Sequence, residues 1–333
     1  MSRISFGVWA AMALTLVPLA GAQSYTVTDL GMLGGGTYAT PTGINDHGTV
    51  VGYASVTGGA YHAFLWTPTH GMQDLGTLPG DSASLAQAIN NSGEVVGGSV
   101  SNAAGTTRAF FWIQSAGMQD LGAGVNSFAF GINNAGSIVG YNLDINAFLW
   151  TGTGGLQDLG TLGGSISQAY AINDSSEVVG YSGLLHDETD DAFLWTETGG
   201  MQNMNTLGGS TGSIAYSING LNQVAGSVFS SSGVQSTAFV WTQSRGMKLL
   251  GVGSPGGASG INAIGEVVGS MGSNPPNAFL WTSVSGVQNL NVLIPPNSGW
   301  VLNQASAINR SGQIAASGTI NGETHAALLT PTN

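Results

Sequence analysis

Short apolar runs and glycine- or asparagine-rich turns alternate along this chain with a period of roughly 44 residues. The first recurring pattern is Ile-Asn-x-x-Gly-x-Val-Val-Gly, as in Ile44–Gly52. It returns from Ile89, Ile132, Ile172, Ile218, Ile261 and, in degraded form, Ile308. The second is Ala-Phe-Leu-Trp-Thr, at Ala63–Thr67 and, intact or varied, from Ala109, Ala147, Ala192, Ala238, Ala278 and Ala326. The third contains Asp-Leu-Gly and is clearest in Gly71–Gly80 and Gly155–Gly164.

Each pattern predicts a short β-strand. Val50–Tyr53 is β-branched and follows a turn, and Phe64–Trp66 is an apolar and aromatic run. Met72–Leu75 alternates apolar with polar residues, and a strand of small residues such as Gln168–Ile172 precedes each Ile-Asn pair. Four short strands per repeat are typical of a β-propeller blade.

The ends of the chain indicate how the repeats are arranged. The seventh repeat has strand patterns at Ala305–Ile308, Gln313–Ala316 and Ala326–Thr330, but no fourth strand. Tyr25–Gly35 carries an Asp-Leu-Gly element that no Ala-Phe-Leu-Trp run precedes. A ring needs this arrangement to cover its terminal edge, whereas an open solenoid gains nothing from it. We therefore predict an all-β, seven-bladed β-propeller over residues 23–333, with the last blade closed by the N-terminal strand. A β-solenoid is the alternative.

Composition supports a β-fold and narrows the range of partners. Glycine accounts for 54 of 333 residues, and charged residues for only 7%. Gly costs about 1 kcal/mol per position in a helix, which disfavours a helical architecture. The formal net charge is −12 with five basic residues, so the chain cannot present the clustered cations that nucleic acids or anionic membranes require. Cysteine is absent, which excludes disulfides and thiolate chemistry.

The N-terminus has the pattern of a secretory signal peptide. Met1-Ser2-Arg3 is short and positively charged, an apolar run follows from Ile4 to Pro18, and Ala20-Gly21-Ala22 has the small-x-small form of a cleavage site. A membrane anchor is the alternative, but a spanning helix needs about 20 apolar residues. We assign residues 1–22 to the signal peptide and expect an exported monomer, periplasmic or extracellular, without a membrane span.

The combination of the three motifs resembles the HAF family of bacterial extracellular repeats, and His62-Ala63-Phe64 shows the triplet itself. The resemblance extends over nearly the whole mature chain. It implies a secreted bacterial protein of repeated β-units, and it supplies no catalytic residues.

Two residue types that recur once per repeat are predicted to be structural. The tryptophans Trp66, Trp112, Trp150, Trp195, Trp241 and Trp281 lie inside strands, where packing between blades explains them better than carbohydrate stacking. Asn45 and its equivalents open tight turns, which local backbone hydrogen bonds explain better than calcium.

Loop length indicates where function lies. The turns between the first and second strands and between the third and fourth are short and uniform, whereas the other connections vary and share the opposite face. Binding residues tend to lie on variable loops over a rigid scaffold. We therefore place the candidate ligand-binding residues on that face: Arg108, Trp300 and His186.

One of these loops is acidic. Carboxylate oxygens suit a hard cation such as Ca²⁺. The candidate metal ligands are Asp187, Glu188, Asp190 and Asp191. The alternative interpretation of this loop is a solvated acidic segment without a metal. For the ligand-binding candidates, the alternatives are a surface salt bridge for Arg108 and packing over the last blade for Trp300.

Two classes of function remain open. The first is a non-catalytic binding or scaffold module for a glycan, peptide or surface partner. The second is an extracellular lyase or hydrolase, which needs a positioned acid–base pair or a metal. The five histidines are scattered and no catalytic order of Ser, His and Asp emerges, so we favour the binding module.

Overall fold

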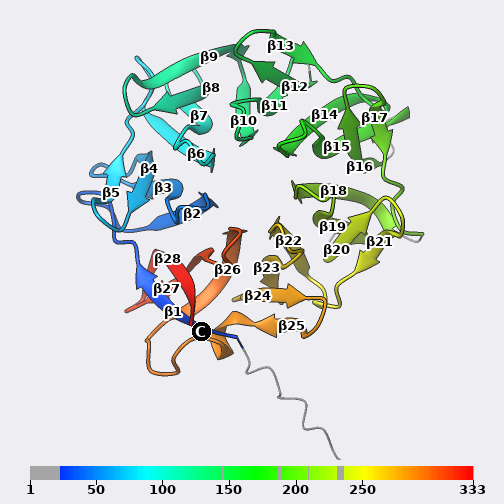
Figure 1. The fold of residues 1–333 in the computed structure, drawn as a ribbon. Helices are drawn as coiled ribbons and strands as arrows, with labels where there is room; N and C mark the ends of the chain where they lie inside the picture. The colour runs from blue at the N-terminus through cyan, green and yellow to red at the C-terminus, as the bar shows by residue number, and fades with distance from the viewer. Residues whose placement is uncertain (1–22, 145, 186–188, 209, 231–235, 333) are drawn as a thin grey trace, which may run out of the picture.

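The protein is a disk of seven four-stranded antiparallel sheets around a central axis (Figure 1). The computed structural model describes residues 23–144, 146–185, 189–208, 210–230 and 236–332. The predicted signal peptide therefore lies outside the described residues. Within the described ranges, no helix combines the length and the hydrophobicity needed to cross a bilayer. The predicted seven-bladed β-propeller is confirmed.

Each blade contributes one strand to each of four concentric positions. The innermost strands are β2 (Ala39–Ile44), β6 (Ala83–Ile89), β10 (Ser127–Ile132), β14 (Gly163–Ile172), β18 (Ser210–Ile218), β22 (Gly256–Ile261) and β26 (Val301–Ile308). The second strands are β3 (Val50–Ser55), β7 (Val95–Ser101), β11 (Ile138–Asn142), β15 (Val178–Leu184), β19 (Val224–Ser230), β23 (Val267–Met271) and β27 (Ile314–Ile320).

The outer half of each blade is built in the same way. The third strands are β4 (Tyr61–Thr67), β8 (Thr106–Ile113), β12 (Asn146–Thr151), β16 (Asp190–Thr196), β20 (Ser236–Thr242), β24 (Asn277–Thr282) and β28 (Glu323–Thr332). The outermost strands are β5 (Gly71–Asp74), β9 (Gly117–Val125), β13 (Gly155–Asp158), β17 (Gly200–Asn203), β21 (Gly246–Leu249), β25 (Gly286–Asn289) and β1 (Ser24–Asp29). A single turn of 3-10 helix, η2 (Leu290–Val292), lies between the sixth and seventh blades.

The N-terminal strand completes the last blade, as the sequence predicts. β1 pairs antiparallel with β28 over six residue pairs, from Ser24 opposite Thr332 to Asp29 opposite Ala327. Tyr25 is 1% exposed and lies in the apolar core between the sixth and seventh blades, and its amide donates to the Leu293 carbonyl. The N-terminal strand thus completes the sheet of the last blade and also packs against the sixth blade.

The apolar runs are continuous because both faces of each blade are buried. In the first blade, Val50 and Phe64 pack against the seventh blade, while Val51 and Leu65 pack against the second. The glycine that follows each Val-Val pair admits the phenylalanine ring: a Cβ on Gly52 would collide with the innermost strand and the Phe64 ring. A sheet buried on both faces shows a hydrophobic run instead of strict alternation, which is the pattern of this sequence.

The asparagines that open the first turn of each blade form a closed ring of hydrogen bonds. Asn45 Oδ1 accepts from the amides of His47 and Thr49, while its Nδ2 donates to the Asn90 carbonyl of the next blade. The inter-blade bond recurs around the disk at 2.9–3.3 Å, and Asn309 donates back to the Asn45 carbonyl. The predicted turn-forming role is confirmed, but the sequence analysis did not predict the ring between blades.

The recurring tryptophans pack in the core, as predicted. Trp66, Trp195 and Trp241 are at most 8% exposed. Trp112, Trp150 and Trp281 are partly buried and pack against the clusters between their own and the adjacent blades.

Tyr25→Ala is expected to lower the free energy of unfolding by about 3–5 kcal/mol, because it removes a buried ring from the closing strand. The Tyr25 hydroxyl is buried without a hydrogen-bond partner among the described residues, so Tyr25→Phe should leave stability unchanged or raise it. Denaturant unfolding of the two variants checks this. A small loss for Tyr25→Ala would show that β1 contributes little to closure.

Candidate ligand-binding site

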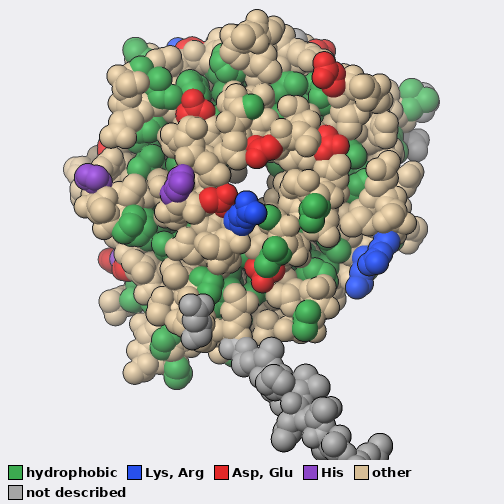
Figure 2. All heavy atoms as spheres, viewed as in Figure 1, with side chains coloured by type: hydrophobic (Ala, Val, Ile, Leu, Met, Phe, Trp, Pro, Cys, Tyr) green, Lys and Arg blue, Asp and Glu red, His purple; other side chains and the backbone are tan. Residues whose placement is uncertain are grey.

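The central channel is divided into two cavities by a ring of isoleucines. These residues end the innermost strands and line both cavities: Ile44, Ile89, Ile132, Ile172, Ile218, Ile261 and Ile308. The smaller cavity, about 550 Å³, adjoins the asparagine ring, and its charged lining residues are Asp46, Asp174 and Arg310. Figure 2 shows one face of the disk, with an opening at its centre and both acidic and basic side chains around it.

The larger cavity, about 950 Å³, extends from the isoleucine ring toward the face with the variable loops. Its volume lies at the upper end of the range of about 300–1,000 Å³ typical of small-ligand pockets. None of the described residues that line it is Asp, Glu, Lys, Arg or His. The acidic protein therefore encloses a neutral cavity, in which hydroxyl, amide and aromatic groups supply the chemistry.

One residue from each blade is directed into this cavity by a β-bulge. In the first blade Pro41 pairs with Gly52 and Gly43 with Val51, so Thr42 between them is left out of the pairing register. The same shift recurs in every innermost strand. A bulge redirects the side chain of its extra residue. The seven bulge residues all line the cavity: Thr42, Gln87, Phe130, Tyr170, Tyr216, Ser259 and Ser306.

The three aromatic bulge residues are neighbours in adjacent blades. The ring centroids of Phe130 and Tyr170 are 4.8 Å apart, and those of Tyr170 and Tyr216 are 5.3 Å apart. Tyr181 on the second strand of the fourth blade stacks at 6.0 Å from Tyr170. Burial raises the pKa of Tyr170, Tyr181 and Tyr216, because desolvation disfavours the phenolate. These phenols stay protonated at neutral pH, and the Tyr170 hydroxyl donates to Gln168 Oε1 at 3.2 Å.

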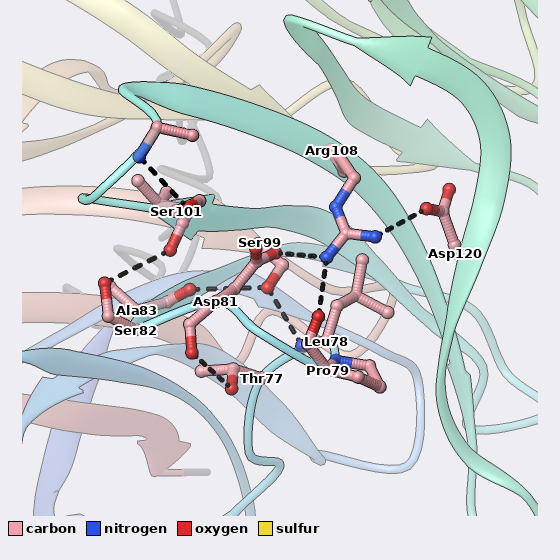
Figure 3. Close-up of polar contacts among 12 residues, drawn as sticks. Thr77, Leu78, Pro79, Asp81, Ser82, Ala83, Ser99, Ser101, Arg108 and Asp120 are labelled. Atoms are coloured by element: carbon pink, nitrogen blue, oxygen red, sulfur yellow. Dashed lines mark hydrogen bonds and ion pairs between the residues drawn. The ribbon is translucent and has the colours of Figure 1, made fainter.

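Arg108 is held in two ion pairs (Figure 3). Its guanidinium lies 3.0 Å from the carboxylates of Asp81 and Asp120 and donates to the Pro79 carbonyl at 3.1 Å. The hydrogen bond to Asp81 raises the pKa of Arg108 further above its already high value. The structure supports the salt-bridge alternative for this residue.

The residue equivalent to Arg108 makes a similar ion pair in the first and seventh blades. His62 Nδ1 lies 2.8 Å from Asp74, and His325 Nδ1 lies 3.0 Å from Asp29, at the equivalent place between the third and fourth strands. Each of these aspartates, like Asp120, also accepts from the amide two residues further on, which caps the turn after the outermost strand. These side chains therefore connect the third strand, the fourth strand and the following turn.

The acidic loop is only partly within the described residues. His186, Asp187 and Glu188 lie outside them, so the ligand and metal roles predicted for these three residues stay predictions. Asp191 is 7% exposed, and its carboxylate accepts hydrogen bonds from Asn203 and Thr206 in the same blade. Asp190 is exposed at the start of β16. No cluster of His, Asp and Glu suited to a metal occurs among the described residues.

Trp300 packs on the last blade. It contacts the core between the sixth and seventh blades, and its ring meets that of His325 edge-on at 6.2 Å. Arg108 belongs to the second blade, Asp190 and Asp191 to the fourth, and Trp300 to the connection into the seventh. The structure thus does not gather the described candidates into one site.

The sequence analysis missed the bulge residues. The available signal was the position two residues before each isoleucine of the Ile-Asn pair, which differs between repeats while its neighbours stay small or apolar. The innermost strands were expected to be purely structural, so candidate binding residues were predicted only in loops whose length varies between repeats.

Comparisons with known proteins identify the fold. No protein family model and no curated protein match the chain, so membership of the HAF family stays a prediction. The β-propeller domain of the Trilobed protease from Pyrococcus furiosus is 9% identical over 88% of this chain and 95% of its own, with a TM-score of 0.54. That domain has an open velcro topology, whereas here β1 pairs with β28.

Two further solved structures match less well. The extracellular domain of a one-component system, BT4673, from B. thetaiotaomicron is 10% identical, with coverage of 91% of this chain and 39% of its own and a TM-score of 0.49. TolB from Acinetobacter baumannii is 12% identical, with coverage of 85% and 79% and a TM-score of 0.43. The likeness to the Trilobed protease domain shows the β-propeller fold alone and nothing about a ligand.

Arg108→Ala is expected to lower the free energy of unfolding by roughly 1–3 kcal/mol, because the Asp81 side chain, 4% exposed, loses its counter-ion. The double variant Arg108→Ala/Asp81→Ala should recover part of that loss, since the carboxylate it leaves unpaired, that of Asp120, is exposed to solvent. Denaturant unfolding of both variants measures the coupling. A neutral effect of Arg108→Ala would instead indicate a solvated arginine that is free to bind an anion.

Stability is expected to fall as the pH rises above about 10. Unfolded tyrosines lose their protons near pH 10, whereas Tyr170, Tyr181 and Tyr216 keep theirs to higher pH in the folded state, since burial raises their pKa. The unfolded state therefore gains from deprotonation first. Tyr170→Phe should flatten the decline, by at most about 1.4 kcal/mol per pH unit. Denaturant unfolding between pH 8 and pH 11 checks both the sign and the slope.

Proposed function

We propose that this protein is an exported, non-catalytic binding module whose ligand occupies the larger channel cavity from the loop-bearing face. The observation that carries the proposal is the contrast within the innermost strands. The isoleucine position is the same in all seven blades, whereas the bulge position carries five residue types and contributes all seven side chains to the cavity. A position needed only for packing has no reason to differ in this way.

The chemistry of the cavity supports binding over catalysis. Proton transfer at neutral pH needs a group with a pKa near 7, and nucleophilic attack needs an activated nucleophile. The titratable residues in the described lining are tyrosines, and burial raises the pKa of Tyr170 and Tyr216. The lining instead provides apolar surface with a few polar groups directed inward, which is the composition of ligand pockets.

The N-terminal sequence supports the proposed export. A short positive segment, an apolar run and a small-x-small site precede Gln23, and the described chain starts its first strand at Ser24. Export and the HAF resemblance agree with each other, because that family is extracellular.

Blocking the cavity is expected to abolish binding, whereas the same change at the opposite mouth should not. Ser306→Trp places an indole ring among the bulge residues of the larger cavity, and Ala263→Trp places the same ring in the smaller one. Mature protein and both variants are applied to printed arrays of glycans and of peptides, with melting temperature as the control for folding. Signals lost only in Ser306→Trp support the proposal. Signals that survive Ser306→Trp, or no signal on either array, contradict it.

A further inference from the structure

The bulge residues divide the wall of the larger cavity into two chemically different arcs. Phe130, Tyr170 and Tyr216 belong to the third, fourth and fifth blades, which are consecutive around the disk (Figure 1). The other four blades supply hydroxyl or amide side chains, which are Ser259, Ser306, Thr42 and Gln87 in order around the ring. An aromatic arc therefore lies across the channel from a polar arc at the same level of the propeller.

The aromatic arc is a continuous surface. Phe130 lies 4.8 Å from both Tyr170 and Phe128, measured between ring centroids, and it stacks on Tyr141 at 5.8 Å. Tyr170 connects this group to Tyr216. All three bulge rings are only partly buried, although each comes from an innermost strand. Their remaining exposed surface faces the cavity they line.

Most side chains of the polar arc have no hydrogen-bond partner among the described residues. Thr42 Oγ1 donates to the carbonyls of Val51 and Ala86, which ties it to the wall. Gln87, Ser259 and Ser306, in contrast, make no side-chain hydrogen bond to any part of the chain that the structure describes. In a solvated channel such groups bond to water, and a ligand that offers matching hydroxyls replaces that water without loss.

We propose that this cavity binds an uncharged saccharide, with the apolar face of a sugar ring on Tyr170 and Tyr216 and its hydroxyl edge toward Ser259, Ser306 and Gln87. This inference rests on the proposed function and names its ligand class. A pyranose carries C–H groups on its faces and hydroxyls at its edge, so it presents both surfaces that the two arcs require. Aromatic rings offer a large rigid contact area, and the Tyr216 hydroxyl adds a donor.

The charge of the lining selects against other ligands. A uronic, sulfated or phosphorylated ligand needs a cation to offset its desolvation, and no described lining residue is Lys, Arg or His. The formal net charge of −12 repels polyanions before they reach the channel. A purely aliphatic ligand would bury the free groups of the polar arc without partners, which costs binding energy.

The internal repeat supplies the matched variants. Serine occupies the bulge position in the sixth and seventh blades, so Tyr170→Ser and Tyr216→Ser install a residue that this position already accommodates. Tyr170→Phe keeps the ring and removes only the hydroxyl. Ser306→Ala removes one hydroxyl from the polar arc.

The experiment is isothermal titration calorimetry of the mature protein with cellotriose, maltotriose and triacetylchitotriose, and with trigalacturonate as the charged counterpart. We expect at least one neutral trisaccharide to bind and trigalacturonate not to bind. Tyr170→Ser and Tyr216→Ser should each weaken binding by about tenfold, with Tyr170→Phe within about threefold of the parent. Ser306→Ala should weaken binding by a smaller factor. Melting temperatures confirm that each variant is folded.

Three results would overturn the saccharide assignment. They are the absence of binding by every neutral trisaccharide, equal binding of trigalacturonate, and neutral binding that both Tyr→Ser variants leave unchanged. If any of these occurs while Ser306→Trp still abolishes an array signal from peptides, the cavity is a binding site for a different ligand and the proposed function stands. If Ser306→Trp changes no signal either, both proposals fail.

Discussion

The fold depends on closure of the ring, and two sets of hydrogen bonds achieve it. β1 pairs with β28 at the outer edge of the last blade, and Asn309 donates to the Asn45 carbonyl next to the channel. Both interactions join residues separated by more than 260 positions in the chain. Each hydrogen bond contributes only about 0.5–1.5 kcal/mol, but without them the first and seventh blades would each expose an apolar face. Closure buries these two faces against each other, as the other six interfaces bury theirs.

A rigid ring explains why the channel tolerates chemical variety. The asparagine and isoleucine at the end of each innermost strand are the same in all blades, so these positions fix the spacing between blades. The bulge residue two positions before the isoleucine is outside the pairing register, so the register does not depend on which side chain stands there. Large rings in three blades and serines in two are accommodated without any change in the order or register of the strands.

The repeat made the fold predictable from sequence, whereas the site was not. Strand boundaries, blade number and the completing strand follow from Ile-Asn, Ala-Phe-Leu-Trp and Asp-Leu-Gly, because each motif has a local physical cause. Arg108 was predicted to bind a ligand because of its place on the face with the variable loops. Its partner Asp81, however, lies in a connection whose position in space cannot be predicted from the sequence. Phe130, Tyr170 and Tyr216 are about 40 residues apart in the chain, and only the curvature of the ring brings their side chains together.

The position of the polar and aromatic arcs also bears on how a ligand is held. A ligand between them contacts strands of several blades, and because every blade is packed on both faces, none of these strands can adjust independently. Binding in such a cavity requires little ordering of the protein, so affinity comes from the fit of the ligand to preformed walls. The same rigidity limits the range of ligands: a ring that stacks on Tyr170 and Tyr216 must place its polar groups where Ser259 and Ser306 already lie. If the channel binds a ligand as we propose, its specificity is set by which residue stands at the bulge of each blade.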